Sequence, residues 1–283
     1  MTAIALVQKL KNLPPVSQAA LKLLSLLDRS SVDNDNIVQV LKYDNVLTAK
    51  LLRACNAPSF GLADPVASVD QAVLILGHQQ ILHIVMMLSF KGVMVDSSMA
   101  NSMETDQLWE HSVLSAVAAE TVLDQLPDLD AKANVAFTAS LLHDIGKLVM
   151  ARTLTTEEMT EIRDRAERKQ IPGTESEREV VGVDHGEVGA ALLKSWRLPE
   201  DIVEAVANHH RPTLKPEVRL SALVHVTNAI AHNASQTPGQ NLHDLKIADN
   251  VATAFGIDAQ KTESMAEAVR KSSEQVERFM AMA

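Results

Sequence analysis

A histidine and an aspartate stand side by side in a stretch of the sequence that is otherwise apolar. His143 and Asp144 occur in the segment ASLLHDIGKLVM, and Lys147 follows three residues after the aspartate. Burying an imidazole and a carboxylate together costs several kcal/mol unless another group compensates them. A divalent cation bound by both side chains is such a compensation. For the pair alone, the alternative is a solvated histidine followed by an aspartate that breaks a helix near its end.

Histidines elsewhere in the sequence could complete a metal site around this pair. Eight of the ten histidines lie after residue 110. An octahedral site needs about four to six nitrogen and oxygen ligands that converge from different elements. One aspartate among many imidazoles suits Fe, Mn, Zn or Ni better than Mg, which prefers oxygen, and more than one ion could be held. The candidate ligands are His111, His143, Asp144, His185, His209 and His210.

Single histidines also have a simpler interpretation. A lone His111 or His185 is more often a hydrogen-bonded core or surface residue than a metal ligand. His209 and His210 are adjacent, and neighbours on a helix point about 100° apart, so we expect at most one of them to point inward. His225 and His232, seven residues apart on a later predicted helix, share one face and could support the ligands, but we interpret them as packed or solvent-tipped residues.

The elements that position these side chains should all be helices. Ten Gly and ten Pro are few for 283 residues, and 46% of the residues are hydrophobic, which is enough to bury a real core. Helix formers such as Leu, Ala, Gln, Glu and Lys dominate over the aromatic and β-branched residues that strands favour. We therefore predict an all-α fold.

Charge and composition exclude several classes of function. The formal net charge is −10, and no segment collects enough Lys and Arg to reverse that sign. Nucleic-acid binding is therefore not expected. Aromatic residues make up only 3% of the chain, which argues against base-stacking or sugar-binding platforms, because those sites need exposed ring faces.

The sequence predicts a cytoplasmic protein that makes no membrane contact. Cys55 is the single cysteine and cannot form an internal disulfide. Lys9 and Lys11 interrupt an N-terminal segment that is too short and polar for a signal peptide. The most apolar stretch, residues 81–90, contains His83 and is much shorter than the roughly 18 residues that span a bilayer. We interpret this stretch as a buried helix.

The first hundred residues have the pattern of short helices separated by turn signals. Ser17 is a predicted cap of one helix, Asp44 or Asn45 caps another, and a further helix begins near Ser68. Residues 96–106 lack periodic hydrophobic positions and form the predicted boundary between two halves. These halves are an N-terminal helical part, 1–100, and a helical part that carries the candidate metal ligands, 101–283.

Strong helical periodicity dominates the second half. A predicted helix over 134–153 carries His143 and Asp144 near its middle, and 171–184 has the proline and glycine content of a loop. The other predicted helices cover 108–126, 155–170, 185–196, 199–209, 216–234 and 258–281.

Several motifs occur in an order typical of a known family. WEH, LLHDIGK, HGEVG, WRLP and NHHRP follow one another between about residues 105 and 235 and resemble the HD superfamily of metal-dependent phosphohydrolases. Upstream, LPPVSQAALKLLSLL, YDNVLTAKLLRACNAPSFG and SVDQAVLILG resemble the HDOD domain, an HD-related module of bacterial signalling proteins. Asn45 and Ala57 depart from the Pro and Ser that this family often has. The resemblance implies a multi-helix HD-like bundle with an N-terminal HDOD subdomain.

The resemblance also implies roles for particular residues. His111, His143 and Asp144 match three ligands of the HD metal centre, and the fourth ligand, an aspartate in active enzymes, aligns with Asn228. An amide is a weaker ligand than a carboxylate, so this departure lowers the expected metal affinity. Lys147 matches a phosphate-contacting lysine, which makes Asp144 and Lys147 the candidate catalytic residues.

A branch of the superfamily, HD-GYP, adds a second comparison. His185, His209 and His210 resemble the extra histidines of that branch, which hydrolyses cyclic di-GMP. The Gly-Tyr-Pro segment that should follow the paired histidines is replaced here by RPTLKPEV. We therefore expect no hydrolysis of cyclic di-GMP.

Two functions fit these residues. The first is a regulatory or interaction module that binds other signalling proteins and keeps part of the metal site for structure or sensing. The second is an active metal-dependent phosphohydrolase that acts on a nucleotide or another phosphorylated small molecule. Asn228 and the missing Gly-Tyr-Pro segment favour the first, whereas the retained histidines favour the second.

Overall fold

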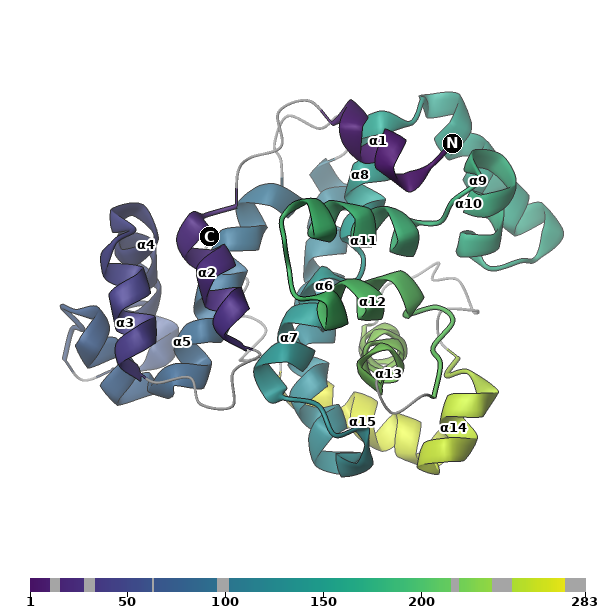
Figure 1. The fold of residues 1–283 in the computed structure, drawn as a ribbon. Coiled ribbons are helices and arrows are strands. Elements are labelled where there is room, and N and C mark those ends of the chain that lie inside the picture. The colour runs from purple at the N-terminus through teal and green to yellow at the C-terminus, as the bar shows by residue number, and fades with distance from the viewer. Residues whose placement is uncertain are drawn as a thin grey trace. The chain divides into compact units, whose positions relative to one another are not determined.

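The computed structural model describes residues 1–10, 16–27, 34–62, 64–95, 102–214, 219–235 and 246–272. Every regular element in these ranges is an α-helix or a short 3-10 helix (Figure 1). The prediction of an all-α fold is therefore confirmed.

The helices form two compact units. We call residues 1–12 and 114–271 the histidine unit, and residues 13–113 and 272–283 the companion unit. The chain changes from one unit to the other inside α6 (Ser102–Gln125). The predicted boundary at 96–106 begins with residues that lie outside the described ranges, so the predicted division at residue 100 stays a prediction.

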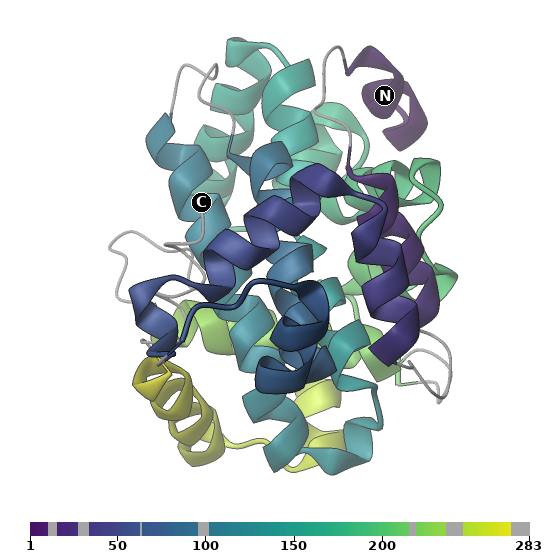
Figure 2. The ribbon, with the colours of Figure 1, turned by 90° about the vertical axis from the view of Figure 1, so that its left-hand side faces the viewer.

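Apolar faces of short helices build the companion unit, which holds α2 (Gln18–Leu27), α3 (Asn34–Lys42), α4 (Asn45–Cys55), η1 (Pro58–Phe60) and α5 (Val69–Met94). In Figure 2 these helices are coloured from purple to blue, and the purple helix beside the label N is α1 (Ala3–Lys9), which belongs to the histidine unit. α3 packs against α2, α4 and α5, and α4 also packs against α5. In α3 and α4, apolar residues three to four positions apart share one face of each helix, and these side chains are all buried: Ile37, Val40, Leu41, Leu47, Leu51 and Cys55.

Polar side chains cap three helices of the companion unit, as predicted. Ser17 accepts hydrogen bonds from the first turn of α2, and Asp44 and Ser68 do the same for α4 and α5. Of the two alternatives for α4, the cap is Asp44 and not Asn45. The Ser17 hydroxyl also donates to the Asp44 carboxylate, so the starts of α2 and α4 are joined.

The long helix α5 is interrupted at Gly77. This residue has φ 78° and ψ 157°, a conformation that residues with a side chain rarely adopt. Residues 81–88, after the break, are buried, which confirms the predicted buried helix. By length and composition alone, α5 is also the one described helix that could cross a membrane, although the core helix of a soluble domain can have the same length and hydropathy.

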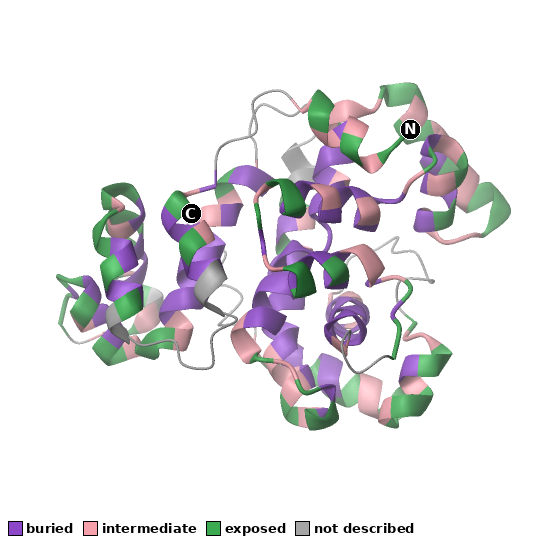
Figure 3. Ribbon diagram, viewed as in Figure 1, coloured by how far each residue is buried: buried purple, intermediate pink, exposed green. Residues whose placement is uncertain are grey.

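The histidine unit contains α1 (Ala3–Lys9), the second part of α6, and then η2 (Pro127–Leu129), α7 (Ala133–Leu142), α8 (Ile145–Thr153), α9 (Thr156–Lys169), α10 (Gly173–Val181), α11 (His185–Ser195), α12 (Glu200–Asn208), α13 (Arg219–Ala234), α14 (Asp249–Phe255) and α15 (Ala259–Lys271). α1 packs against α8 and α11. α11 also packs against α12, and both α12 and α13 pack against α7. Figure 3 shows α13 as an almost wholly buried helix.

Two predictions about this unit are wrong in an instructive way. The predicted loop at 171–184 contains α10, because Pro172 and Gly182 mark the two ends of a helix. Gly182 has a φ of 94°, the left-handed conformation that ends a helix. The short helix α14 lies in a region where no helix was predicted. The predicted helix over 258–281 corresponds to α15, and its last nine residues, 273–281, lie outside the described ranges.

Candidate metal site

The His143-Asp144 pair lies at the break between α7 and α8. α7 ends at Leu142, α8 begins at Ile145, and Asp144 has φ −97° and ψ 7°. The exposed fractions of His143 and Asp144 are 0% and 1%. The prediction that the pair sits inside one continuous helix is therefore wrong, and so is the alternative of a solvated histidine.

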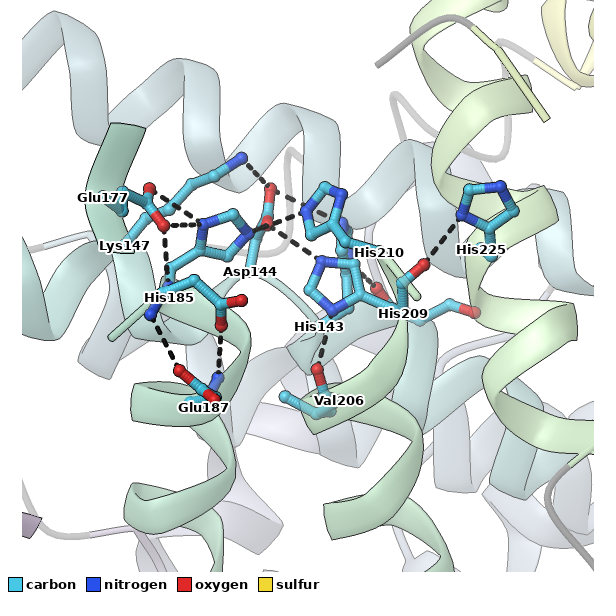
Figure 4. A network of polar contacts seen from close by, with 12 residues as sticks. His143, Asp144, Lys147, Glu177, His185, Glu187, Val206, His209, His210 and His225 are labelled. Carbon is cyan, nitrogen blue, oxygen red and sulfur yellow. Dashed lines mark hydrogen bonds and ion pairs between the residues drawn. The ribbon is translucent and has the colours of Figure 1, made fainter. Parts of the chain in front are cut away.

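Four side chains converge beside this break (Figure 4). The Nε2 atom of His185 lies 3.2 Å from Oδ1 of Asp144 and 3.0 Å from Nε2 of His210. The Nε2 atom of His209 lies 3.8 Å from the same Asp144 oxygen. One potential ligand atom from each of the four residues lies within 4.8 Å of the others. Nitrogen and oxygen atoms at this spacing can share a transition-metal ion.

The neighbours His209 and His210 both belong to this cluster, so the prediction that at most one of them points inward is wrong. Their ring centroids are 4.1 Å apart. α12 ends at Asn208 and His209 keeps helical backbone angles, so both rings lie at the end of the helix, where no following turn separates a buried from an exposed face.

Hydrogen bonds determine which ring nitrogen faces the cluster. Nδ1 of His143 donates to the carbonyl of Ser140 at 2.7 Å, and Nδ1 of His209 donates to the carbonyl of Val206 at 2.7 Å. A neutral imidazole has one N–H, so Nε2 of each ring keeps its lone pair. The Nε2 atom of His209 is buried and makes no hydrogen bond with the described residues. This arrangement fits a metal ligand, since a cation would satisfy that lone pair.

Burial and neighbouring charges set the protonation of the site. Burial lowers the pKa of His143 and holds the pKa values of His209 and His210 well below their usual range. These rings are therefore neutral at pH 7, the form that binds metals. Burial would raise the pKa of the Asp144 carboxyl, but its interactions with His143, Lys147 and His185 hold this pKa well below its usual range. The aspartate is therefore ionised.

Lys147 places a positive charge at the edge of the site. Its Nζ atom donates to Oδ2 of Asp144 at 2.7 Å, and its side chain is 37% exposed. A lysine that is both paired and partly exposed can also contact an anionic group from solvent. This position is compatible with the predicted contact to a phosphate.

Gly146 permits the close crossing of α8 and α11. A Cβ atom on Gly146 would lie 1.8 Å from the carbonyl oxygen of His185 and 2.7 Å from the amide nitrogen of Gly189. No side chain fits there. The glycines of HDIGK and HGEVG thus allow Asp144, at the start of α8, to meet His185, at the start of α11.

Two predicted ligands lie outside the cluster of four, and like the rest of the ligand set they stay predictions. His111 is half-buried on the part of α6 that belongs to the companion unit. Asn228 is buried on α13, and its neighbour Thr227 shares a 3.0 Å hydrogen bond with Ser140. The Ser140 carbonyl in turn accepts from His143, so this part of α13 lies against the end of α7 that leads into the site.

Two contacts near the site were not predicted from the sequence. The Glu177 carboxylate on α10 accepts a hydrogen bond from His185. His225 is packed, as predicted, but its Nδ1 donates to the carbonyl of His209 at 2.8 Å, and its Nε2 accepts from the N–H of Ala248 at 2.9 Å. Their partners lie on other helices or connections, so no local pattern indicates these contacts.

The fold and the buried cluster match a known family. The family model of the HDOD domain matches residues 13–212. This match covers most of the chain, and the chain therefore belongs to the HDOD domain family. The resemblance inferred from the sequence motifs is confirmed.

Solved structures share the fold at low sequence identity. A provisionally assigned phosphohydrolase from Shewanella amazonensis SB2B is 22% identical, with a TM-score of 0.70, and the match covers 99% of this chain and 97% of that chain. A provisionally assigned signal transduction protein from Marinobacter aquaeolei VT8 is 18% identical, with a TM-score of 0.76, over 98% of this chain and 63% of that chain. At these identities the likeness shows the fold alone.

A curated relative is longer than this chain. An uncharacterized protein from Treponema pallidum (strain Nichols) is 22% identical over 215 residues, which are 76% of this chain and 41% of that protein. This chain thus matches less than half of the length of that relative.

Proposed function

We propose that this protein is a regulatory HDOD module that binds a divalent transition metal and acts by binding other signalling proteins. The observation that carries the proposal is the buried convergence of Asp144, His185, His209 and His210. Burying these groups together is costly unless a cation compensates them. Fe, Mn, Zn or Ni suits this donor set, and His143, which adjoins Asp144, is the proposed ligand of a further ion.

A regulatory role is favoured over catalysis by two departures from the enzymes of the superfamily. Asn228 stands where those enzymes have an aspartate ligand, and an amide neither neutralises a cation nor binds it as tightly. The segment RPTLKPEV replaces the Gly-Tyr-Pro segment of the cyclic di-GMP hydrolases. The signal transduction protein with the same fold is a further, weaker support.

An active phosphohydrolase is the second candidate, and Lys147 is the observation that favours it. A bound divalent cation would supply Lewis-acid stabilisation of a phosphoryl oxygen. Lys147 would add a positive charge at the partly exposed edge of the site, next to Asp144. His210, which is less buried than His209, would exchange a proton with the substrate. The substrate would be a nucleotide or another phosphate ester.

We also propose a cytoplasmic location without membrane contact. The thiol of Cys55 is buried and free, and burial raises its pKa to about 11. Such a thiol is inert to disulfide exchange. The apolar residues of α5 that follow Gly77 are largely buried, which leaves little apolar surface there for lipid.

Metal content and turnover test the proposal together. Elemental analysis of protein purified without added metal should find a transition metal, and His143→Ala combined with Asp144→Ala should remove it. Circular dichroism should show that this variant keeps its helices, because the apolar core supplies most of the burial energy. His78→Ala combined with Asp64→Ala, at two exposed positions, is the matched control and should keep the metal.

An assay with nucleotides, phosphate monoesters and cyclic dinucleotides separates the two candidates. The regulatory proposal predicts no metal-dependent hydrolysis, including none of cyclic di-GMP. Hydrolysis that disappears in the His143→Ala and Asp144→Ala double variant would establish the enzyme instead. Absence of metal from the wild-type protein, and failure to take it up, would contradict both candidates.

A further inference from the structure

Glu177 is a buried carboxylate that contacts only one member of the histidine cluster. It lies on α10 and is 8% exposed. Its Oε2 accepts the backbone N–H of His185 at 2.8 Å, and both of its oxygens lie within 3.0 Å of Nδ1 of His185. Figure 4 shows the carboxylate on the side of the His185 ring opposite Asp144. The His185 imidazole is thus held between two carboxylates.

The turn between α10 and α11 brings these two residues together. Gly182 ends α10 in the left-handed conformation. Asp184 then caps α11, because its side chain accepts the N–H of Glu187 while the Glu187 side chain accepts the N–H of Asp184. His185 is therefore the first residue of α11, and its ring lies beside the last turns of α10. A contact across eight residues follows from this turn.

The other cluster histidines are oriented differently. Nδ1 of His143 and Nδ1 of His209 each donate to a backbone carbonyl three residues earlier in the chain. Only His185, among these three, donates to a carboxylate. A charged acceptor makes a stronger hydrogen bond than a carbonyl and increases electron density on the opposite ring nitrogen. In His185 that nitrogen is Nε2, which points toward Asp144 and His210.

We propose that Glu177 is a positioning residue of the metal site, which fixes the Nδ1–H tautomer of His185 and makes its Nε2 the strongest nitrogen donor of the cluster. This inference rests on the proposed metal binding. It assigns Glu177 no contact with the metal and no contact with substrate.

A purely structural role of Glu177 is the competing explanation, because its carboxylate also accepts the first N–H of α11. Asp184 and Glu187 already cap that helix start. Loss of the Glu177 contact should therefore leave α11 formed. A decisive measurement must consequently report on the metal ligand and not only on stability.

Metal affinity of the full chain provides that measurement. Glu177→Gln keeps the size of the side chain and removes its charge. Competition against a chelator at pH 8.5, with Zn²⁺ and Co²⁺ as the probes, should show binding about 10- to 100-fold weaker than in wild type. The Co²⁺ absorption spectrum should change as well, because the donor strength of one ligand changes. Glu177→Asp should restore part of the affinity.

Glu179→Gln is the matched control. Glu179 lies on the same helix, but it pairs with Arg165 and Lys169 away from the cluster. This variant should bind both metals within about twofold of wild type, since it loses only a surface ion pair. A melting temperature measured without metal identifies any loss of stability in either variant.

Each outcome decides a separate claim. If the wild-type protein binds metal and Glu177→Gln equals it in affinity and spectrum, the inference is overturned and the proposed function stays intact. Wild type that binds no metal would overturn both. If Glu177→Gln does not fold, nitrogen NMR of the zinc-loaded wild type decides, because the inference requires a protonated Nδ1 and a zinc-bound Nε2 in His185. Zinc on Nδ1 would overturn it.

Discussion

The two units bury different kinds of side chain. The histidine unit places charged and titratable groups against one another away from water, in the set His143, Asp144, Glu177, His185 and His209. Among the described residues of the companion unit, the buried polar side chains are His83 and Ser112. Its other polar contacts join helix ends, as between Ser17 and Asp44.

This difference separates a binding site from a scaffold. Buried charges lower stability unless they are compensated, so a cluster of them indicates a ligand. The companion unit buries mainly apolar side chains, although its Tyr43, Val46 and Leu74 are 87%, 68% and 85% exposed. We therefore expect metal binding at the cluster of Asp144, His185, His209 and His210 to depend on the histidine unit, and the stability of the companion unit to depend on packing and helix caps.

Two glycine substitutions, one in each unit, should differ most in their effects on stability and metal binding. Gly146→Ala would place a methyl group against the His185 carbonyl. It should cost about 3 kcal/mol and abolish metal binding. Gly92→Ala, on α5 of the companion unit, meets no atom within 4 Å and should stabilise by about 0.5 kcal/mol. Thermal melts and metal titrations check both variants. If both variants change melting temperature and metal affinity only slightly, the α8–α11 crossing tolerates a side chain.

Metal binding should depend on pH through His185. Burial would lower the pKa of this imidazole, but the Glu177 and Asp144 carboxylates raise it to about 9. A metal at Nε2 must displace that proton, so apparent affinity should fall about tenfold for each pH unit below 9, or roughly 30-fold from pH 8 to pH 6.5. The rings with lowered pKa values are already neutral there and add little. Chelator competition at both pH values measures the change, and a flat profile would contradict a protonated His185.

Asn228→Asp tests whether α13 contributes to the site. If Asn228 occupies the ligand position, the added carboxylate should tighten metal binding by about 10-fold or more. If Asn228 only packs inside α13, the variant should lose stability, because a buried unpaired carboxylate is costly. Zn²⁺ competition and a thermal melt distinguish the two results. Unchanged affinity would remove Asn228 from the ligand set.

Asp44→Ala should give the smallest effect and should be confined to the companion unit. Loss of this helix cap should cost about 1 kcal/mol, without any change in metal affinity. Burial would raise the pKa of Asp44, but hydrogen bonds from Ser17 and Leu47 lower it below 3.8. Its contribution to stability is therefore present above pH 3.8 and is lost as the pH falls further. Asp64→Ala, at an exposed position, is the control for denaturant melts. A weaker metal site in Asp44→Ala would contradict the separation of the units.

Local patterns in the sequence determined the fold class, the helix caps and the set of candidate ligands. Helical spacing predicts the buried faces of α3 and α4, and Ser17, Asp44 and Ser68 act as caps because a cap interacts with residues one turn away. His185 correctly marks the start of α11. These features depend on neighbours within a few residues, so a single sequence contains enough information for them.

Only the tertiary structure decided how the site is assembled. Three features of the site depend on contacts between helices. They are the helix break at His143 and Asp144, the inward direction of both His209 and His210, and the carboxylate of Glu177 beside His185. The crossing at Gly146 brings two helix starts together, and no periodicity in either helix specifies that meeting. Side chains that face one another across separate helices have no fixed spacing in sequence, so the donor set could be predicted but its geometry could not.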